Sequence, residues 1–265
     1  MYETNYHRAS SVEGAIKLRG DHEEGRYLAG GMTLIATMKQ RLAAPSDLID
    51  LRHIPDLAGI SIDGGNVRLG AATPHAEVAR SEELRAVCPA LCNLAGMIGD
   101  PHVRHMGTIG GSIANNDPAA DYPAAMLALG ATIITDRRWI TADEFFIGLF
   151  ETALEEGEMV TAVTFEAPEK AGYAKFANPA SRYALTGVFV AKSADGVRVG
   201  VTGAGANGVF RHTGMEEALE SNWAPDSVAG ADVDPEDMLY DMHASAAYRA
   251  NLVKVMAKRA VIAAG

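Results

Sequence analysis

The sequence predicts an α+β fold built from three consecutive units. Two segments share one design, in which a glycine pair leads into a helix, and each segment lies in a different unit. After Pro168 the pattern changes to alternating strands followed by helices. We therefore expect units over residues 1–57, 58–168 and 171–265.

The first unit is expected to be a small strand–helix–strand arrangement. Residues 27–29 read as a strand that enters the pair Gly30-Gly31, and residues 34–42 carry apolar side chains at helical spacing. Thr33 is of a type that caps helices. A second short strand is expected over residues 48–51.

The second unit should begin with a β-hairpin and continue with helices. Alternating residues on both sides of Asp63-Gly64-Gly65-Asn66 predict two paired strands, 60–62 and 67–69. We expect one helical stretch over residues 74–97. It contains Cys88 and Cys92, the chain's two cysteines. They lie four residues apart, and we interpret them as buried thiols on one helix face, because no ligand set for a metal ion or an iron–sulfur cluster surrounds them.

Gly110 and Gly111 form the second glycine pair. A glycine pair lets the backbone turn tightly and present bare N–H groups to an anion. Asp117 is a favoured N-cap residue and Pro118 suits the first helical position, which predicts a helix over residues 119–129. The strands expected to complete this unit are 131–134 and 160–165.

The third unit contains one segment with the letters of a dinucleotide fingerprint, Gly203-Ala-Gly-Ala-Asn-Gly208. We interpret it as a glycine-rich strand exit, because no clean helix follows it and no acidic residue ends a second strand about 20 positions on. The strands expected here are 173–177, 183–192 and 197–202, and helices should begin near Met215 and Ala244.

Composition excludes several classes of protein. A formal net charge of −11 argues against a nucleic-acid binder, which would need a basic surface. No apolar run approaches the roughly 20 residues of a membrane span, and residues 1–20 lack the apolar centre of a signal peptide. We therefore expect a cytoplasmic protein.

Two anion-binding turns in one chain indicate a diphosphate ligand, because each can offer N–H groups and a helix N-terminus to one phosphate. The two segments read Ala29-Gly-Gly-Met-Thr33 and Thr108-Ile-Gly-Gly-Ser-Ile-Ala, the latter continuing to Asp121-Tyr-Pro. Together with Tyr248-Arg249 and Lys258-Arg-Ala260, they make nearly the whole chain similar to the FAD-binding medium subunit of the molybdenum hydroxylases. That family includes carbon monoxide dehydrogenase and xanthine dehydrogenase, and this chain resembles the carbon monoxide dehydrogenase branch more.

The resemblance implies both a fold and a cofactor. It implies a two-part FAD-binding domain of the molybdopterin dehydrogenase type, similar to that of vanillyl-alcohol oxidase, followed by a C-terminal domain of the carbon monoxide dehydrogenase flavoprotein type. The cofactor is FAD, and the residues implied to bind it are Ala29, Gly30, Gly31, Met32, Thr33, Leu34, Thr108, Ile109, Gly110, Gly111, Ser112, Asn115, Asp121, Lys175 and Tyr183.

Two of these assignments have simpler alternatives. Asp121 could accept hydrogen bonds from ribityl or ribose hydroxyls, or it could be a first-turn acid favoured by a helix dipole. Tyr183 could cover the isoalloxazine or simply be an aromatic residue at a strand start. Many relatives carry an Asp-Tyr pair where this chain has Arg182-Tyr183, so the local charge is reversed and the electron acceptor is left open.

The resemblance further implies an electron-transfer subunit without catalytic residues or a metal site of its own. Its partners would be a large molybdopterin-binding subunit and a small [2Fe–2S] subunit, in a heterotrimer or a dimer of heterotrimers. FAD on this chain would pass electrons from the clusters to an external acceptor. The alternatives are a stand-alone flavin oxidoreductase of the same superfamily and a flavin-free assembly module.

Overall fold

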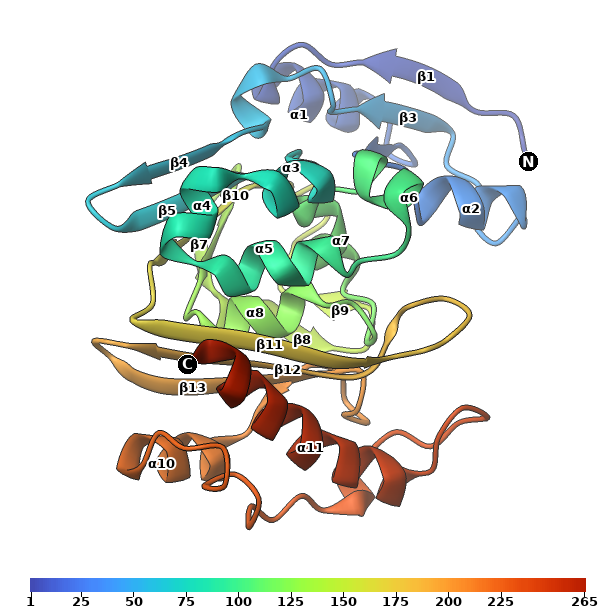
Figure 1. Ribbon diagram of the computed structural model, residues 1–265. Helices are drawn as coiled ribbons and strands as arrows, with labels where there is room; N and C mark the ends of the chain where they lie inside the picture. Colours follow the sequence, from blue (N-terminus) through green and yellow to red (C-terminus); the bar gives the residue numbers. More distant parts are fainter.

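The computed structural model describes residues 1–265, and its main sheets are stacked in chain order along the molecule. Figure 1 shows the first sheet at one end, the second sheet with a group of helices in the middle, and the third sheet with its own covering helices at the other end. No helix has both the length and the apolar character that crossing a bilayer requires.

The first sheet is fully parallel and contains two elements that the sequence did not predict. Its order is β1 (Asn5–Arg8), β3 (Asp47–Asp50), β2 (Arg26–Leu28). Helices α1 (Val12–Asp21) and α2 (Leu34–Lys39) connect the strands, as parallel pairing requires. The predicted strand–helix–strand is confirmed as β2–α2–β3, whereas β1 and α1 were missed.

The second sheet is antiparallel and confirms the predicted hairpin. Its order is β4 (Ile60–Asp63), β5 (Asn66–Gly70), β10 (Val160–Glu166), β6 (Thr132–Thr135), β7 (Trp139–Thr141). Asp63 pairs with Asn66, and Gly64 and Gly65 between them have φ of +56° and +90°. Positive φ at both central residues is the requirement of a type I′ turn, which explains the glycine pair there.

The predicted single helical stretch over residues 74–97 is broken into α3 (His75–Arg80), α4 (Glu82–Val87) and α5 (Pro89–Gly96). Ser81 accepts a hydrogen bond from the Leu84 N–H and so caps α4, and Pro89 occupies the first turn of α5. Cys88 lies at the junction rather than within a helix. Both thiols are free and buried as expected, and burial raises the pKa of Cys88 to about 12.

The helix predicted over residues 119–129 is shorter, because α8 runs only from Tyr122 to Ala128. Asp117 accepts from the Ala119 N–H within a separate turn and does not cap a helix. Thr202 donates to the carbonyls of Pro118 and Ala120, which holds this turn against the end of a strand in the third sheet. These long-range bonds explain why the helix starts late.

The remaining elements of the middle region are short. They are α6 (Pro101–Met106), α7 (Ile109–Asn115), α9 (Ala142–Phe145), and the two-stranded hairpin of β8 (Phe146–Gly148) and β9 (Glu151–Thr152). Side chains of α3, α4, α5, α7, α8 and the second sheet contribute to the largest hydrophobic core of the molecule.

The third sheet is antiparallel and packed on both faces. Its order is β11 (Lys170–Ala177), β12 (Ala184–Ser193), β13 (Gly196–Thr202), β14 (Phe210–Arg211). In β12, Phe189 points into the middle core, and Val188 and Val190 point to the core beneath α11 (Ala246–Ala264). Figure 1 shows α11 and α10 (Thr213–Ser221) on the side of this sheet away from the other two.

The glycine-rich segment after β13 is confirmed as a strand exit. No helix begins between Gly203 and His212, and the next helix is α10. Gly203 has φ of +79°, and a Cβ there would lie 2.3 Å from the Ala184 carbonyl oxygen, so both the turn and the packing require glycine.

Candidate functional site

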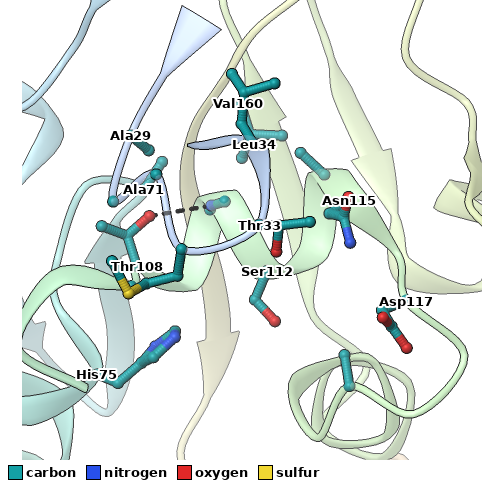
Figure 2. A pocket seen from close by; sticks show the side chains of 18 of the residues that line it. Ala29, Thr33, Leu34, Ala71, His75, Thr108, Ser112, Asn115, Asp117 and Val160 are labelled. Carbon is teal, nitrogen blue, oxygen red and sulfur yellow. Dashed lines mark hydrogen bonds between the residues drawn. The ribbon is translucent and has the colours of Figure 1, made fainter. Parts of the chain in front are cut away.

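One large cavity lies where the first sheet meets the middle helices. Its volume is about 780 Å³, within the range of about 300–1,000 Å³ that is usual for cofactor sites. Figure 2 shows that its walls come from segments far apart in the sequence, with Thr33 on the first glycine loop and Ser112 and Asn115 on α7. The segment 181–183 also contributes to the lining.

The first glycine loop offers an uninterrupted row of free hydrogen-bond donors to this cavity. None of the six backbone N–H groups from Ala29 to Leu34 has an acceptor within the chain, and all six residues line the cavity. Gly31 has φ of +70°, a conformation that favours glycine. Successive free N–H groups ahead of a helix form an anion-binding concavity, so this loop fits a phosphate group.

Gly30 lets this loop approach the middle helices closely. A Cβ on Gly30 would lie 2.0 Å from the Met106 carbonyl oxygen and 2.7 Å from Cα of Gly107. Thr33 makes no side-chain capping bond, contrary to the sequence-based expectation. Its hydroxyl therefore remains available to a ligand.

The second glycine pair has a different role from the one predicted. Gly110 and Gly111 lie in the first turn of α7, whose N-cap is Thr108. The Gly110 N–H donates to the Ala71 carbonyl at 2.8 Å, the dashed line in Figure 2, and the Gly111 N–H donates to Thr108 Oγ1 at 3.1 Å. The expectation that this pair presents bare N–H groups is therefore wrong.

The absence of side chains at Gly110 and Gly111 allows α7 to pack closely against its neighbours. A Cβ on Gly110 would lie 2.4 Å from Cβ of Ala71, so this glycine lets α7 pack against the end of β5. A Cβ on Gly111 would lie 3.6 Å from Cβ of Ala29, which places the bare face of Gly111 toward the first loop. The two glycine pairs therefore meet at the cavity.

Asp121 lies at the cavity wall but is only 4% exposed. Its carboxylate accepts a 2.5 Å hydrogen bond from the Tyr173 hydroxyl and pairs with Lys175 Nζ at 2.9 Å. Burial raises the pKa of Asp121, and the Lys175 charge and the Tyr173 hydroxyl oppose that rise. Since both partners lie on β11, Asp121 joins the cavity wall to the third sheet.

Most of the predicted cofactor-binding residues are brought together. Thirteen of the fifteen line the cavity, and Ile109 and Lys175 do not. Ile109 is fully buried in the middle core, and the Lys175 side chain is buried against Asp121. Tyr183 is half-exposed at the cavity, beside Arg182. Burial and the nearby carboxylates of Asp117 and Asp121 raise the pKa of Tyr183.

Sequence reasoning missed His75, a lining residue that is almost fully buried. Its Nδ1 atom has no hydrogen-bond partner in the chain, and its ring packs on Tyr122 with centroids 5.3 Å apart. Burial, with a smaller contribution from Arg104, lowers the pKa of His75 to about 4, so the ring is neutral at pH 7. A lone histidine at a helix start gave no signal in the sequence.

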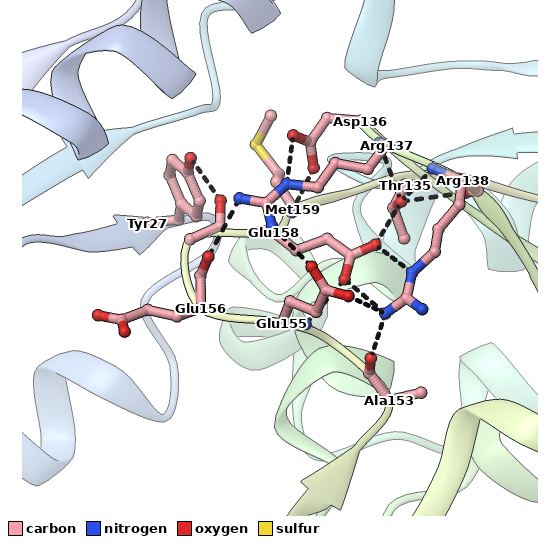
Figure 3. Close-up of polar contacts among 11 residues, drawn as sticks. Tyr27, Thr135, Asp136, Arg137, Arg138, Ala153, Glu155, Glu156, Glu158 and Met159 are labelled. Atoms are coloured by element: carbon pink, nitrogen blue, oxygen red, sulfur yellow. Dashed lines mark hydrogen bonds and ion pairs between the residues drawn. The ribbon is translucent and has the colours of Figure 1, made fainter.

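Glu158, also missed, is a lining residue of the cavity, and its carboxylate is buried among polar partners (Figure 3). Arg138 contacts both of its oxygens at 3.0 Å, and Thr135 and the Glu155 N–H donate to it at 2.7 Å. Burial alone would raise the pKa of Glu158, but these donors together lower it to about 2. The cluster fixes the wall where β6 ends and β10 begins.

Phe150 is a third missed residue, at the tip of the β8–β9 hairpin. Its φ is +56°, its side chain is exposed, and it lines the cavity. Asn116, itself at φ +42°, holds the tip through its amide, which donates to the carbonyls of Gly148 and Glu151 at 2.9 Å. Phenylalanine has no preference for this conformation, so its sequence gave no sign of the turn.

These features fit a flavin dinucleotide. The row of free N–H groups suits a diphosphate, and the cavity is large and lined by 18 hydrophobic residues among 36. The donor set contains no lysine or arginine at the first loop, so phosphate charge would be met by backbone dipoles.

Comparisons with known proteins agree with this geometry. Residues 2–167 match the model of the FAD binding domain in molybdopterin dehydrogenase. The chain is 33% identical to the nicotine 6-hydroxylase medium subunit of Paenarthrobacter nicotinovorans and 33% identical to the carbon monoxide dehydrogenase medium chain of Hydrogenophaga pseudoflava, in each case over 98% of this chain and 96% of the relative.

A solved structure of carbon monoxide dehydrogenase from Hydrogenophaga pseudoflava superimposes with a TM-score of 0.90 at 33% identity, covering 99% of this chain and 97% of that one. The family match covers more than half of the chain, and both relatives match it almost from end to end. The chain therefore belongs to the family of FAD-binding domains of the molybdopterin dehydrogenases.

Proposed function

We propose that this chain is the FAD-binding electron-transfer subunit of a molybdenum-containing hydroxylase or dehydrogenase. The observation that carries the proposal is the row of six acceptor-free N–H groups at the 780 Å³ cavity of a chain in this family. Flavin supplies the redox chemistry, since it can take up electrons singly and release them as a pair. The residues of this chain bind the cofactor, orient it and exclude water from it.

We assign the pyrophosphate to the first glycine loop. The N–H groups of residues 29–34 would hold it, with hydroxyl donors from Thr33, Thr108 and Ser112. Asn115 and Tyr183 would lie beside the flavin, and Asp121, already held by Lys175, would set the cavity wall. Ile109 and Lys175 would act from behind that wall, because neither lines the cavity.

The relatives support a multi-subunit enzyme. Their names describe a medium subunit and a medium chain, and this chain covers 96% of each. We propose a large molybdopterin-binding partner and a small [2Fe–2S] partner in the cytoplasm, with this chain passing electrons from the clusters to an external acceptor. The two relatives are equally similar, yet their names refer to nicotine and to carbon monoxide, so similarity alone does not select a substrate.

The test is the flavin content of the purified chain and of one cavity variant. After incubation with FAD and desalting, the wild-type chain should keep absorbance bands at about 370 and 450 nm. Gly111→Val should lose them while remaining folded, because its side chain would project between Thr108 and Ala29. Gly20→Val is the matched control, since a Cβ there meets nothing within 4 Å, and it should keep the flavin.

If the isolated chain keeps no flavin, the same comparison is made after coexpression with the large and small subunits. A complex without FAD would contradict the proposed function. Normal flavin content in Gly111→Val would contradict the assignment of the cofactor to these loops.

A further inference from the structure

A cluster of two histidines and one aspartate lies in the first sheet, outside the cavity. His7 lies on β1, His22 follows α1 directly, and Asp47 begins β3. One potential ligand atom from each residue lies within 4.8 Å of those of the other two. None of the three residues lines the cofactor cavity, so the proposed flavin site does not account for this cluster.

The carboxylate of Asp47 is the centre of the cluster. Its side chain is 4% exposed, with Oδ1 2.6 Å from His7 Nε2 and Oδ2 3.4 Å from His22 Nδ1. The β1–β3 register aligns Asn5 with Asp47, which puts His7, two residues on, on the same face of the sheet. The two imidazole rings lie 4.6 Å apart and only 31° from parallel, so both approach the same carboxylate.

Hydrogen bonding satisfies only part of this arrangement. His7 can bond to Asp47 directly, but the side chain of His22 has no hydrogen-bond partner in the chain. A divalent cation held by the three residues would give the His22 ring the partner that it lacks within the chain.

The ligand chemistry points to zinc. Two imidazole nitrogens and one carboxylate oxygen form a usual three-residue set for Zn²⁺, with water in the fourth position. Zinc bonds of about 2.0 Å in a tetrahedron separate neighbouring ligand atoms by about 3.3 Å. The ligand atoms of His7 and His22 lie 2.6 and 3.4 Å from the Asp47 carboxylate, and those of all three residues lie within 4.8 Å of one another. His7 and His22 remain partly exposed, so water can reach the site and the rings can adjust.

We propose that His7, His22 and Asp47 bind one Zn²⁺ ion that joins β1, the end of α1 and β3. These segments are far apart in the sequence, and β1 is an edge strand held only by β3. A metal bond between them would restrain the strand that begins the chain. The site lies outside the proposed flavin cavity.

The test uses the full chain, freed of metal with a chelator and titrated with Co²⁺ as a spectroscopic substitute for Zn²⁺. We expect one Co²⁺ per chain, a visible ligand-field band that Zn²⁺ abolishes, and a rise in Tm on adding Zn²⁺. His22→Gln and Asp47→Asn should each weaken Co²⁺ binding by more than about tenfold. His105→Gln, an exposed histidine on α6, is the control and should bind as the wild type does.

His22→Gln is the decisive variant, because its side chain makes no hydrogen bond and its loss should not affect folding. The proposal is overturned if the wild-type chain shows no Co²⁺ band, or if His22→Gln and the wild type bind Co²⁺ equally. Flavin content should be the same in all these proteins, so failure here would leave the proposed function intact.

Discussion

Positive φ can be predicted from the sequence where the residue is glycine, and not where it is another residue. Gly31 and the pair Gly64-Gly65 are visible in the sequence because glycine is the residue that turns with positive φ favour. Asn116 and Phe150 also adopt positive φ, and they are bonded to each other through the Phe150 N–H and the Asn116 carbonyl. Strain in non-glycine residues of this kind concentrates at functional sites, and here Phe150 lines the cavity.

Replacing Phe150 with glycine should stabilise the fold and weaken flavin binding. A left-handed conformation costs a non-glycine residue about 1–2 kcal/mol, and the entropy cost of glycine is about 0.5–1 kcal/mol, so a net gain of up to about 1.5 kcal/mol remains. Phe150 is 61% exposed, so little packing is lost. Urea unfolding would measure the gain, and the rate of FAD release would measure the loss of a cavity wall.

Leu149→Gly is the control for this prediction. Leu149 is the exposed neighbour of Phe150 and has no positive φ, so glycine there relieves no strain and should destabilise the protein. Equal stability changes in the two variants would show that Phe150 carries no recoverable strain.

Elements with regular periodicity could be predicted from the sequence, and elements fixed by distant contacts could not. The β4–β5 hairpin and strand β12 follow local patterns of alternation and turn residues. The start of α8 depends instead on bonds from Thr202 to the preceding turn, which join positions more than 80 residues apart. Strand β1 was missed because Asn5 to Arg8 are largely polar and exposed, so no apolar pattern marks them.

The same distinction holds for the site. The glycine loops were recognisable as motifs, and thirteen of fifteen predicted residues do line one cavity. The sequence did not show which backbone N–H groups are free to bind a ligand. Whether the Gly110 N–H donates to the Ala71 carbonyl or to a ligand depends on how β5 packs against α7. His75 and Glu158 reach the cavity through tertiary packing and were invisible for the same reason.

Glu158 joins the end of β6 to the start of β10 through its bonds to Thr135 and Arg138. Its carboxylate should make the free energy of unfolding depend on pH. Its folded-state pKa of about 2 lies below its ordinary value of 4.5, so its contribution is fully present above about pH 4.5 and is lost as the pH falls toward 2. Glu158→Gln should cost about 1–3 kcal/mol at pH 7, because Arg138 loses a charged partner. The difference from wild type should vanish near pH 2.

Urea unfolding of both proteins between pH 2 and pH 7 would measure this. Glu156→Gln is the control, since Glu156 pairs with Arg19 on the surface and is 84% exposed. That variant should change stability by less than about 1 kcal/mol at any pH. If the difference in unfolding free energy between wild type and Glu158→Gln persisted unchanged to pH 2, it would contradict the lowered pKa of Glu158.

At the scale of the whole molecule, the cofactor cavity and the third sheet share structural support. Phe189 of β12 packs in the middle core, and Thr202 of β13 bonds to the turn before α8. The division into units 1–57, 58–168 and 171–265 stays a prediction, because contacts as extensive as these do not reveal which parts unfold separately. The buried triad of Asp121, Tyr173 and Lys175 is the most polar of these connections.

Lys175→Met should destabilise the whole molecule, by about 3–5 kcal/mol at neutral pH, because it leaves the Asp121 charge buried without a counter-charge, with only the Tyr173 hydroxyl still bonded to it. Burial already raises the pKa of Asp121, and removing Lys175 removes an opposing charge. The folded variant therefore takes up a proton at a pH where the unfolded chain is ionised, so the cost should grow from pH 5 to pH 8.

The double variant Asp121→Asn/Lys175→Met separates the two roles considered for Asp121. It should recover much of the stability lost in Lys175→Met, since no unpaired charge remains, and unfolding free energies of the four proteins give the coupling. If Asp121 serves only to join the sheet to the cavity wall, the double variant should also regain FAD at wild-type level. If its carboxylate accepts a hydrogen bond from the cofactor, stability returns but FAD affinity stays below wild type, because the amide oxygen of asparagine is a weaker acceptor than the charged carboxylate. Additive losses of stability in the two single variants would contradict the pairing itself.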